Sequence, residues 1–217
     1  MKIFIDIGHG GLEVGAIAKD GRLEKDLNLV VGMRVRGLLI QNGFDVKCSR
    51  EMDVDVSLEE RCMVANEWGA DLFISIHHNA GGGRGFEVIH SLTLGEGKKF
   101  ADILGSEYLA FNNLRNVYSR ESETDKGKDY YYVIRYSNMP SVISEFCFID
   151  TADIKSFNAE NEAQCIFRAC LRYKGQHWAQ SSWDELRAKG VQILEMRFDD
   201  KITRGEVFCL LNQIVKR

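Results

Sequence analysis

Residues 1–11 read MKIFIDIGHGG, an apolar run that stops at a glycine and a histidine. The alternation within it predicts a buried strand over Lys2–Ile7. The amphipathic stretch 26–41 then predicts a helix, and Asn42-Gly43 supplies its end. A second run of the same kind, ADLFISIHHNA at residues 70–80, predicts a strand over 71–76 that is followed by His77 and His78. Strand and helix therefore alternate from the start of the chain.

This alternation continues to about residue 175. Further strands are predicted at 44–48, 85–89, 130–134 and 141–146, and further helices at 57–68, 96–111 and 160–174. Residues 112–129 are polar and predict an irregular segment. Alternating strands and helices favour an α/β fold with a largely parallel twisted sheet flanked by helices, followed by a small C-terminal helical appendix.

The composition is that of an ordinary globular protein. The 217 residues include 45% hydrophobic and 28% charged residues with one proline, which excludes wholesale disorder and a proline-rich stalk. A net charge of −4 argues against binding nucleic acid through a diffuse basic surface. The longest apolar stretch, 27–40, carries two arginines and is too short to span a bilayer, so we expect no membrane anchor.

The N-terminal stretch and the cysteines favour synthesis in the cytoplasm. Asp6 interrupts what could have been the apolar part of a signal peptide, so we expect no signal peptide. The six cysteines are scattered without a CxxC pair, which favours free buried thiols in a reducing compartment over a disulfide framework.

Two histidine positions follow strands of the predicted sheet. His9 lies after the first strand within GHGG, and His77-His78 lies after the strand that begins at Asp71. The carboxyl ends of strands are where open α/β sheets place their ligand crevice. The glycines around His9 leave room for a ligand or an ion to approach the backbone.

Two carboxylates are candidate partners of these histidines. Glu24 lies just before the long helix, where a solvated charge favourable to the helix dipole is the alternative. Glu145 lies inside an otherwise apolar run from Pro140 to Ile149, and a carboxylate in a buried strand is costly unless it is paired or ligated. His, Glu and His fit zinc with a fourth position open for water, and a separate carboxylate fits a general base. This combination is typical of metal-assisted amide or ester hydrolysis.

Short runs along residues 1–175 carry a family resemblance. They are IDIGHGG at 5–11, GA at 15–16, LEKDLNL at 23–29, LEER at 58–61, AN at 65–66, ADLFISIHHNA at 70–80, GFEV at 85–88 and MPSVISEFCFI at 139–149. In this order they resemble the zinc-dependent N-acetylmuramoyl-L-alanine amidases of the amidase-3 type. The resemblance implies zinc bound by His9, Glu24 and His77, with Glu145 as the catalytic carboxylate.

Several positions depart from the family's pattern. Glu13-Val14 stands where the family usually has Asp-Pro, and His78 and Cys147 stand where it usually has small residues. Successive strand residues point to opposite faces, so one member of the His77-His78 pair should face the metal.

The sequence predicts the roles of four further residues less specifically. Arg61 and Asn79 match the family's pattern and could orient ligands or substrate, although a plain helix-surface role for Arg61 is an equal alternative. His90 and His177 match nothing in the pattern and are expected to be surface or packing residues.

Residues 176–217 differ in kind from the preceding chain. They predict two short helices, the first capped by Ser182 and the second by Thr203. Trp178-Ala179, Trp183, Ala188-x-Gly190-Val191 and Asp200-x-x-Thr203-Arg204-x-Glu206-Val207 resemble an S-layer-homology-like module that follows some phage amidases. We therefore divide the chain into a catalytic domain, 1–175, and a helical module, 176–217, that binds the cell wall, self-associates or packs on the catalytic domain.

These observations lead to one expected function. We expect a peptidoglycan amidase that cleaves the bond between N-acetylmuramic acid and L-alanine. A phage endolysin held in the host cytoplasm until its release to the wall is favoured over a secreted autolysin. A zinc peptidase or deacetylase that uses the same site, and a wall-binding protein without turnover, are the alternatives.

Overall fold

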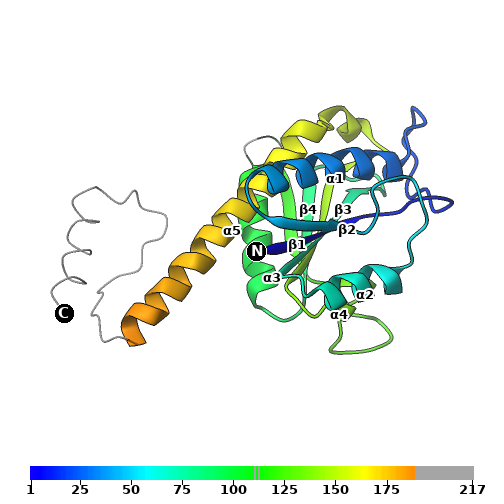
Figure 1. Cartoon of the computed structure of the whole chain (residues 1–217). Coiled ribbons are helices and arrows are strands. Elements are labelled where there is room, and N and C mark those ends of the chain that lie inside the picture. The colour runs from blue at the N-terminus through cyan, green and yellow to red at the C-terminus, as the bar shows by residue number, and fades with distance from the viewer. Residues whose placement is uncertain (110, 112, 189–217) are drawn as a thin grey trace. The chain divides into compact units, whose positions relative to one another are not determined.

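The computed structural model describes residues 1–109, 111 and 113–188, apart from the side chains of 114, 115 and 176–188 (Figure 1). Within these residues the strands are β1 Lys2–Ile7, β2 Asp45–Cys48, β3 Leu72–Asn79, β4 Phe86–His90, β5 Leu114–Tyr118 and β6 Ser141–Phe148. The helices are α1 Glu24–Gln41, α2 Leu58–Trp68, α3 Glu96–Tyr108, α4 Tyr132–Tyr136 and α5 Ala159–Ala188, with a 3-10 helix over Ala152–Ser156. None of the helices in this part of the chain combines the length and the apolar character needed to cross a membrane.

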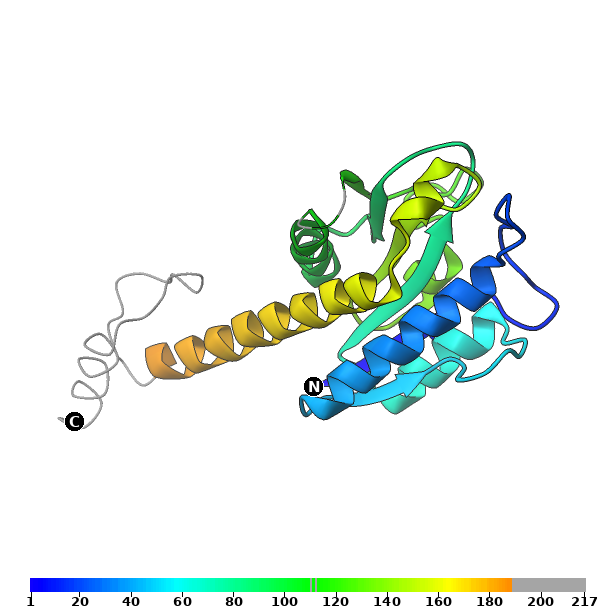
Figure 2. The same cartoon turned by 90° about the horizontal axis from the view of Figure 1, so that it is seen from above.

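The strands form one sheet in the order β2-β1-β3-β6-β4-β5. Neighbouring strands are parallel except for β4 and β6, which are antiparallel. The predicted α/β fold with a largely parallel sheet is therefore confirmed. Because β1, β3 and β6 are parallel neighbours, their carboxyl ends meet at one edge. Figure 2 shows residues 8–23 looping out beside the N-terminal end of α1, next to this edge.

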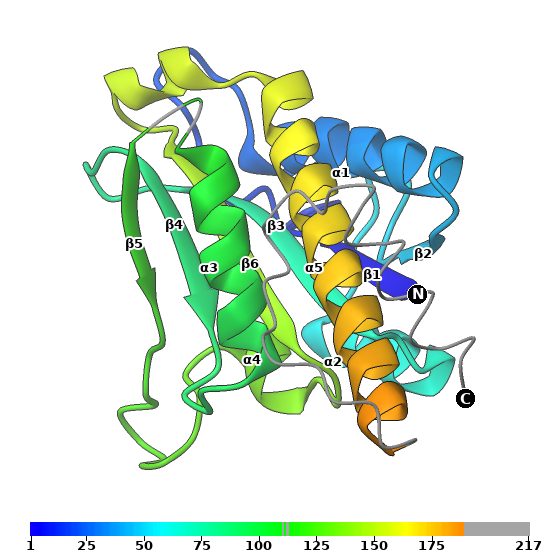
Figure 3. The same ribbon diagram turned by 90° about the vertical axis from the view of Figure 1, so that its left-hand side faces the viewer.

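Helices cover both faces of the sheet (Figure 3): α1, α3 and the start of α5 on one face, α2 and α4 on the other. The central strands are consequently apolar on both sides. Phe4 and Phe73 stack with ring centroids 5.3 Å apart and belong to the core under α2 and α4. The alternate residues Ile3, Ile5 and Ile7 are fully buried. This leaves the carboxyl edge as the place where polar side chains gather.

Two predictions of local structure are wrong. The predicted strand 130–134 is instead helix α4 with its preceding turn, because Val133 and Ile134 are buried in the core beneath α2. Strand propensity of aromatic and β-branched residues is easily overridden by such packing. The segment 112–129, predicted to be irregular, contains β5, which pairs with β4 at the edge of the sheet.

The C-terminal helix is longer than predicted. α5 runs without a break from Ala159 to Ala188, through Gly175, where a boundary was expected. A single glycine inside a helix costs only about 0.5–1 kcal/mol relative to alanine, too little to end it. The predicted short helix after Ser182 is therefore the end of α5. The chain divides into compact units at Met1–Leu171 and Arg172–Arg217; the helix predicted from Thr203 lies outside the described residues.

Two element boundaries bear on the site. α1 begins at Glu24 rather than at residue 26, so this carboxylate lies in the first helical turn. β3 extends to Asn79, so His77 and His78 lie inside the strand and not after it. The five cysteines among the described residues are free thiols, in agreement with the sequence.

Candidate active site and metal centre

Three predicted metal ligands meet at the carboxyl edge of the sheet. Glu24 lies between the two histidines: its Oε2 is 3.0 Å from His9 Nε2, and its Oε1 is 2.9 Å from His77 Nδ1. The centroids of the two imidazole rings are 4.8 Å apart, and the ring planes are 81° to one another. One ligand atom from each of the three residues lies within 4.8 Å of the other two. The structure thus brings the expected donors together, and their role as ligands stays a prediction.

The backbone at Gly8 and Gly15 lies very close to the side chains of the candidate ligands. His9 has a φ of 59°, in the left-handed region that few non-glycine residues adopt. A Cβ atom at Gly8 would lie 2.3 Å from the His77 ring, and one at Gly15 would lie 2.6 Å from Glu24 Oε2. The two glycines are therefore needed for the three side chains to converge.

A buried ion pair holds the segment that carries His9. Arg61 is 4% exposed, so the helix-surface alternative for it is wrong. Its guanidinium donates to the carbonyl oxygens of Ile7 at 2.7 Å and His9 at 3.1 Å. It also lies 2.6 Å from Asp6 Oδ1, and the Ser75 hydroxyl donates to the other Asp6 oxygen at 2.6 Å. Arg61 thus positions the backbone of a candidate ligand.

A second buried arginine braces the same segment. Arg50 donates to the carbonyl oxygens of Ile7 at 3.1 Å, Gly8 at 3.0 Å and Lys25 at 2.7 Å. It therefore links the end of β1 to the start of α1, the two segments that carry His9 and Glu24. Sequence reasoning missed Arg50, because a lone arginine after a short strand gives no sign of burial.

Glu24 is buried, with 4% of its surface exposed, so the solvated-charge alternative is wrong. Beyond the two imidazoles, its carboxylate accepts the backbone N–H of Ala16 at 2.9 Å and that of His78 at 3.1 Å. These donors fix the carboxylate in place and stabilise its negative charge. The carboxylate is therefore held ready for a cation.

The protonation equilibria of the three groups are coupled. Burial alone would raise the pKa of Glu24, but hydrogen bonds from His77 and His9 outweigh it and lower that pKa well below its usual range. Burial likewise opposes a charge on His77, yet Glu24 raises the pKa of His77 to about 9. The pKa of His9 is raised for the same reason. The site thus favours a carboxylate with positive charge beside it.

Glu145 lies next to this group in the sheet. It is the register partner of His77 across the parallel pair β3 and β6, and of Glu87 across the antiparallel pair β4 and β6. Register partners on neighbouring strands project to the same face of a sheet. Desolvation raises the pKa of Glu145 to about 7. A carboxylate with such a pKa can take up and release a proton near neutral pH.

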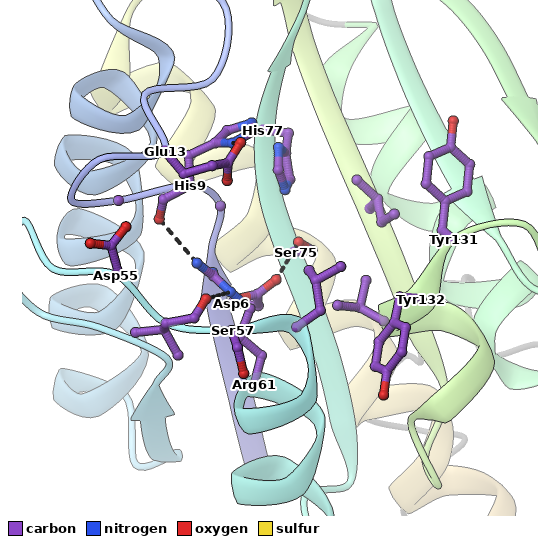
Figure 4. A pocket seen from close by; sticks show the side chains of 16 residues that line it. Asp6, His9, Glu13, Asp55, Ser57, Arg61, Ser75, His77, Tyr131 and Tyr132 are labelled. Atoms are coloured by element: carbon purple, nitrogen blue, oxygen red, sulfur yellow. Dashed lines mark hydrogen bonds and ion pairs between the residues drawn. The ribbon is translucent and has the colours of Figure 1, made fainter.

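A pocket of about 570 Å³ opens beside the site on the face of α2 and α4 (Figure 4). His9 and Glu13 lie on one side of it, Tyr131 and Tyr132 on the other, and His77 lies between them. Glu13 Oε1 is 2.8 Å from His9 Nδ1. The pocket therefore gives a substrate access to the two candidate histidine ligands.

The two adjacent histidines of β3 point to opposite faces, as predicted. The imidazole of His78 is buried on the face of α1 and α5, with Nδ1 2.7 Å from Asn28 Oδ1.

Asn79 donates to Glu87 Oε2 at 2.9 Å, so it orients a neighbour of Glu145 and not a candidate ligand. His90 is buried and bonded to the carbonyl of Ser91, a packing role; the His177 side chain lies outside the described residues.

The sequence profile of a family described as N-acetylmuramoyl-L-alanine amidase matches residues 3–170. The chain belongs to this family. Among its relatives is the amidase CwlM of Bacillus licheniformis, 38% identical over 77% of this chain and 65% of that protein. The endolysin of Bacillus phage SPP1 is 33% identical over 70% of this chain and 56% of its own length.

A solved amidase structure has the same fold. The N-acetylmuramoyl-L-alanine amidase from Clostridium difficile 630 superposes with a TM-score of 0.71 at 29% identity, covering 79% of this chain and 95% of that one. The chain spans about two thirds or less of the length of the two relatives named above. The family match ends at residue 170, close to the limit of the first compact unit at Leu171.

Proposed function

We propose that this chain hydrolyses the amide bond between N-acetylmuramic acid and L-alanine in bacterial peptidoglycan. One observation carries the proposal: His9, Glu24 and His77 converge beside an open pocket, and Glu145 is the register partner of His77. Family membership supports the choice of this amide over other substrates.

The donor set fits zinc. Two imidazoles and one carboxylate are a ligand set that zinc uses in hydrolytic sites, where a fourth position stays open. The buried carboxylate of Glu24 and the two imidazole nitrogens lie close enough together to share one ion. Held by these three residues, zinc would supply Lewis-acid activation of water and of the amide carbonyl.

Glu145 is assigned the proton transfers. Its carboxylate accepts a proton from the water that attacks the carbonyl carbon, and the resulting carboxylic acid donates this proton to the amide nitrogen as the carbon–nitrogen bond breaks. The products are the lactyl carboxylate of the muramic acid and the free amino group of L-alanine. Burial raises the pKa of Glu145 above its usual range, which lets one group perform both steps.

Analysis of digested peptidoglycan tests this function. The purified full chain should release peptides that begin with L-alanine and leave the glycan strands uncut. Acetate as the product would indicate a deacetylase, other new amino termini a peptidase, and no product a wall-binding protein. Each of these three results would overturn the amidase assignment.

Elemental analysis of variants tests the zinc ligands. We expect the ion to be lost from His9→Ala and from His77→Ala, together with the activity. His78→Ala should retain the ion at this site and with it the amidase activity, because the His78 imidazole faces away from the pocket. Loss of amidase activity in His78→Ala, with activity retained in His77→Ala, would show that the wrong neighbour had been chosen.

We further propose that the enzyme serves as a phage endolysin. Similarity to the endolysin of phage SPP1 supports this, while similarity to the bacterial amidase CwlM supports a bacterial autolysin as the alternative. An endolysin would remain in the host cytoplasm until its release to the wall. Expression inside a Gram-positive host, with and without a membrane-permeabilising holin, tests it: lysis that requires the holin fits the endolysin role, and lysis without it contradicts that role.

The segment beyond the catalytic unit is proposed to target the enzyme to the wall or to mediate self-association. The family match ends at residue 170, which supports a catalytic unit that does not need residues 176–217. The expected S-layer-homology-like pattern in these residues supports wall attachment over self-association.

A further inference from the structure

A second group of metal-ligating side chains lies on the opposite face of the sheet. His78 of β3, Cys147 of β6 and Glu162 of α5 each offer a ligand atom within 4.8 Å of the other two. Their exposed fractions are 1%, 0% and 1%. His78 and Cys147 are two of the positions where the sequence departs from the family's pattern, and the amidase chemistry uses neither. The structure places His78 and Cys147 beside the same carboxylate, that of Glu162.

Hydrogen bonding determines which nitrogen of His78 carries a proton. The Asn28 amide nitrogen donates to the carbonyl oxygen of Gly8 at 3.1 Å, which turns Asn28 Oδ1 toward His78 Nδ1 at 2.7 Å. Nδ1 therefore carries the hydrogen and donates a hydrogen bond to Asn28 Oδ1. His78 Nε2 then lies 3.1 Å from Glu162 Oε2. A lone pair on Nε2 and a carboxylate oxygen repel each other unless a cation, either a proton or a metal ion, lies between them.

The other oxygen of Glu162 favours a metal ion over a proton. Glu162 Oε1 is buried and has no hydrogen-bond partner in the part of the chain that the structure describes. Leaving such an atom unpaired is costly. A proton shared with His78 would satisfy Oε2 alone. A divalent ion could engage the whole carboxylate, Nε2 and the sulfur of Cys147, and its charge would balance one carboxylate and one thiolate in the dry interior.

We propose that His78 Nε2, Cys147 Sγ and the Glu162 carboxylate bind a second divalent transition-metal ion, with zinc the best match to this donor set. Imidazole nitrogen, thiolate sulfur and carboxylate oxygen are all established zinc donors. Because the three side chains are buried, a substrate has no access to the ion, and the site is structural. It ties the first turns of α5 to strands β3 and β6.

This structural site also supports the residues around the catalytic one. The backbone N–H of His78 donates to Glu24 Oε1, and the Asn28 amide nitrogen lies 3.4 Å from the same oxygen. His78, a ligand of the second site, and Asn28, which orients its imidazole, therefore also hold a ligand of the first. The second site does not depend on the amidase assignment, since none of its ligands takes part in the proposed hydrolysis.

Cobalt substitution distinguishes the two sites, because only the second contains sulfur. Full-length protein stripped of metal is titrated with Co²⁺ and followed by absorption, with metal content measured after removal of free ion. We expect about two ions per chain and a near-ultraviolet cobalt–thiolate charge-transfer band. His77→Ala should keep the band with about one ion. Cys147→Ser should lose the band and keep about one ion.

Controls make the assignment to Cys147 specific. Cys62→Ser removes another buried thiol, which belongs to α2 and packs in the core on the other face of the sheet, and should leave the band unchanged. Glu162→Gln should weaken cobalt binding in the band-forming site by at least about tenfold, since the amide lacks the carboxylate charge. The absence of the band from wild-type protein saturated with Co²⁺ would overturn the proposal and leave a His78–Glu162 ion pair. Persistence of the band in Cys147→Ser would overturn it as well.

Discussion

His77 and Glu145 are register partners on the adjacent parallel strands β3 and β6. A candidate metal ligand and the candidate general base therefore stand side by side on the same face of a sheet. Their separation is set by the spacing of hydrogen-bonded strands, and no loop lies between them. Sites built on strands are held more accurately than sites on loops, and accurate placement is what proton transfer requires.

Replacing Glu145 should separate catalysis from metal binding. Glu145→Gln keeps the shape of the side chain but cannot accept the proton, so kcat should fall by about 10²- to 10⁴-fold. Metal content should be unchanged, because Glu145 is not one of the proposed ligands. Glu59→Gln on the exposed side of α2 is the matched control and should behave as wild type. Near wild-type turnover by Glu145→Gln would exclude it as the base.

The rate of hydrolysis should fall on the acid side of neutrality. Desolvation raises the pKa of Glu145 to about 7, and a base acts only in its deprotonated form, so kcat/KM should rise with pH up to that value. A cation held by the adjacent ligands would stabilise the carboxylate, which places the acid limb at or below about pH 7. The assignment of Glu145 as the base is contradicted if the acid limb of the pH profile of kcat/KM lies clearly above pH 7. It is also contradicted if this limb is unchanged in Glu145→Gln.

The close approach at Gly8 predicts a sharp effect of one methyl group. A Cβ atom there would lie 2.3 Å from the His77 ring, so Gly8→Ala should displace the ring and abolish both metal binding at this site and activity. Gly37→Ala in α1, where a Cβ meets no atom within 4 Å, is the control and should be neutral or stabilising by about 0.5–1 kcal/mol. Metal analysis with thermal unfolding separates the two effects; full metal content in Gly8→Ala would contradict the structure.

The buried pair of Arg61 and Asp6 should dominate the stability of the segment that carries His9. Arg61→Met leaves the Asp6 carboxylate buried without its cation and should lower the free energy of unfolding by about 3–5 kcal/mol. The exposed pair of Arg34 and Glu160 is the comparison, and Arg34→Met should cost about 0–1 kcal/mol. Urea denaturation measures both; equal costs would show that the buried pair has no special role.

Removal of the C-terminal segment should affect whole cells more than soluble substrate. Because α5 continues to Ala188, we would end the shortened chain there and not at the predicted boundary. It should keep its metal and cleave soluble muropeptides at close to the full-length rate. It should lyse intact cells less well, because losing one of two linked binding sites lowers the effective concentration at the wall. Equal lysis of cells would contradict wall targeting, and loss of metal would place residues 189–217 in the catalytic unit.

The sequence alone was sufficient to predict which strands carry the histidines of the site. The apolar runs before His9 and His77 predicted two strands with polar ends, and parallel strands must bring those ends to one edge. The opposite orientations of His77 and His78 followed from the two-residue period of a strand. These features depend on local periodicity, which a single sequence contains.

What escaped prediction depends on contacts between distant segments. Helix α4, within and after the predicted strand 130–134, forms because Val133 and Ile134 pack under α2. Strand β5 forms because β4 offers it an edge. The burial of Arg50 also depends on distant segments. The contact between His78 and Glu162 joins residues 84 positions apart. No local pattern encodes such pairings.

The consecutive histidines of β3 make this strand unusually sensitive to changes of length. A slip of one residue turns every side chain of a strand to the other face. Deleting a single residue between Leu72 and Ile76 would move one histidine from the pocket into the core and the other from the core into the pocket. One such event would disable the catalytic site and the proposed structural site together, whereas any point substitution at either histidine affects its own site first. Insertions and deletions should therefore be excluded from this strand even where the flanking turns tolerate them.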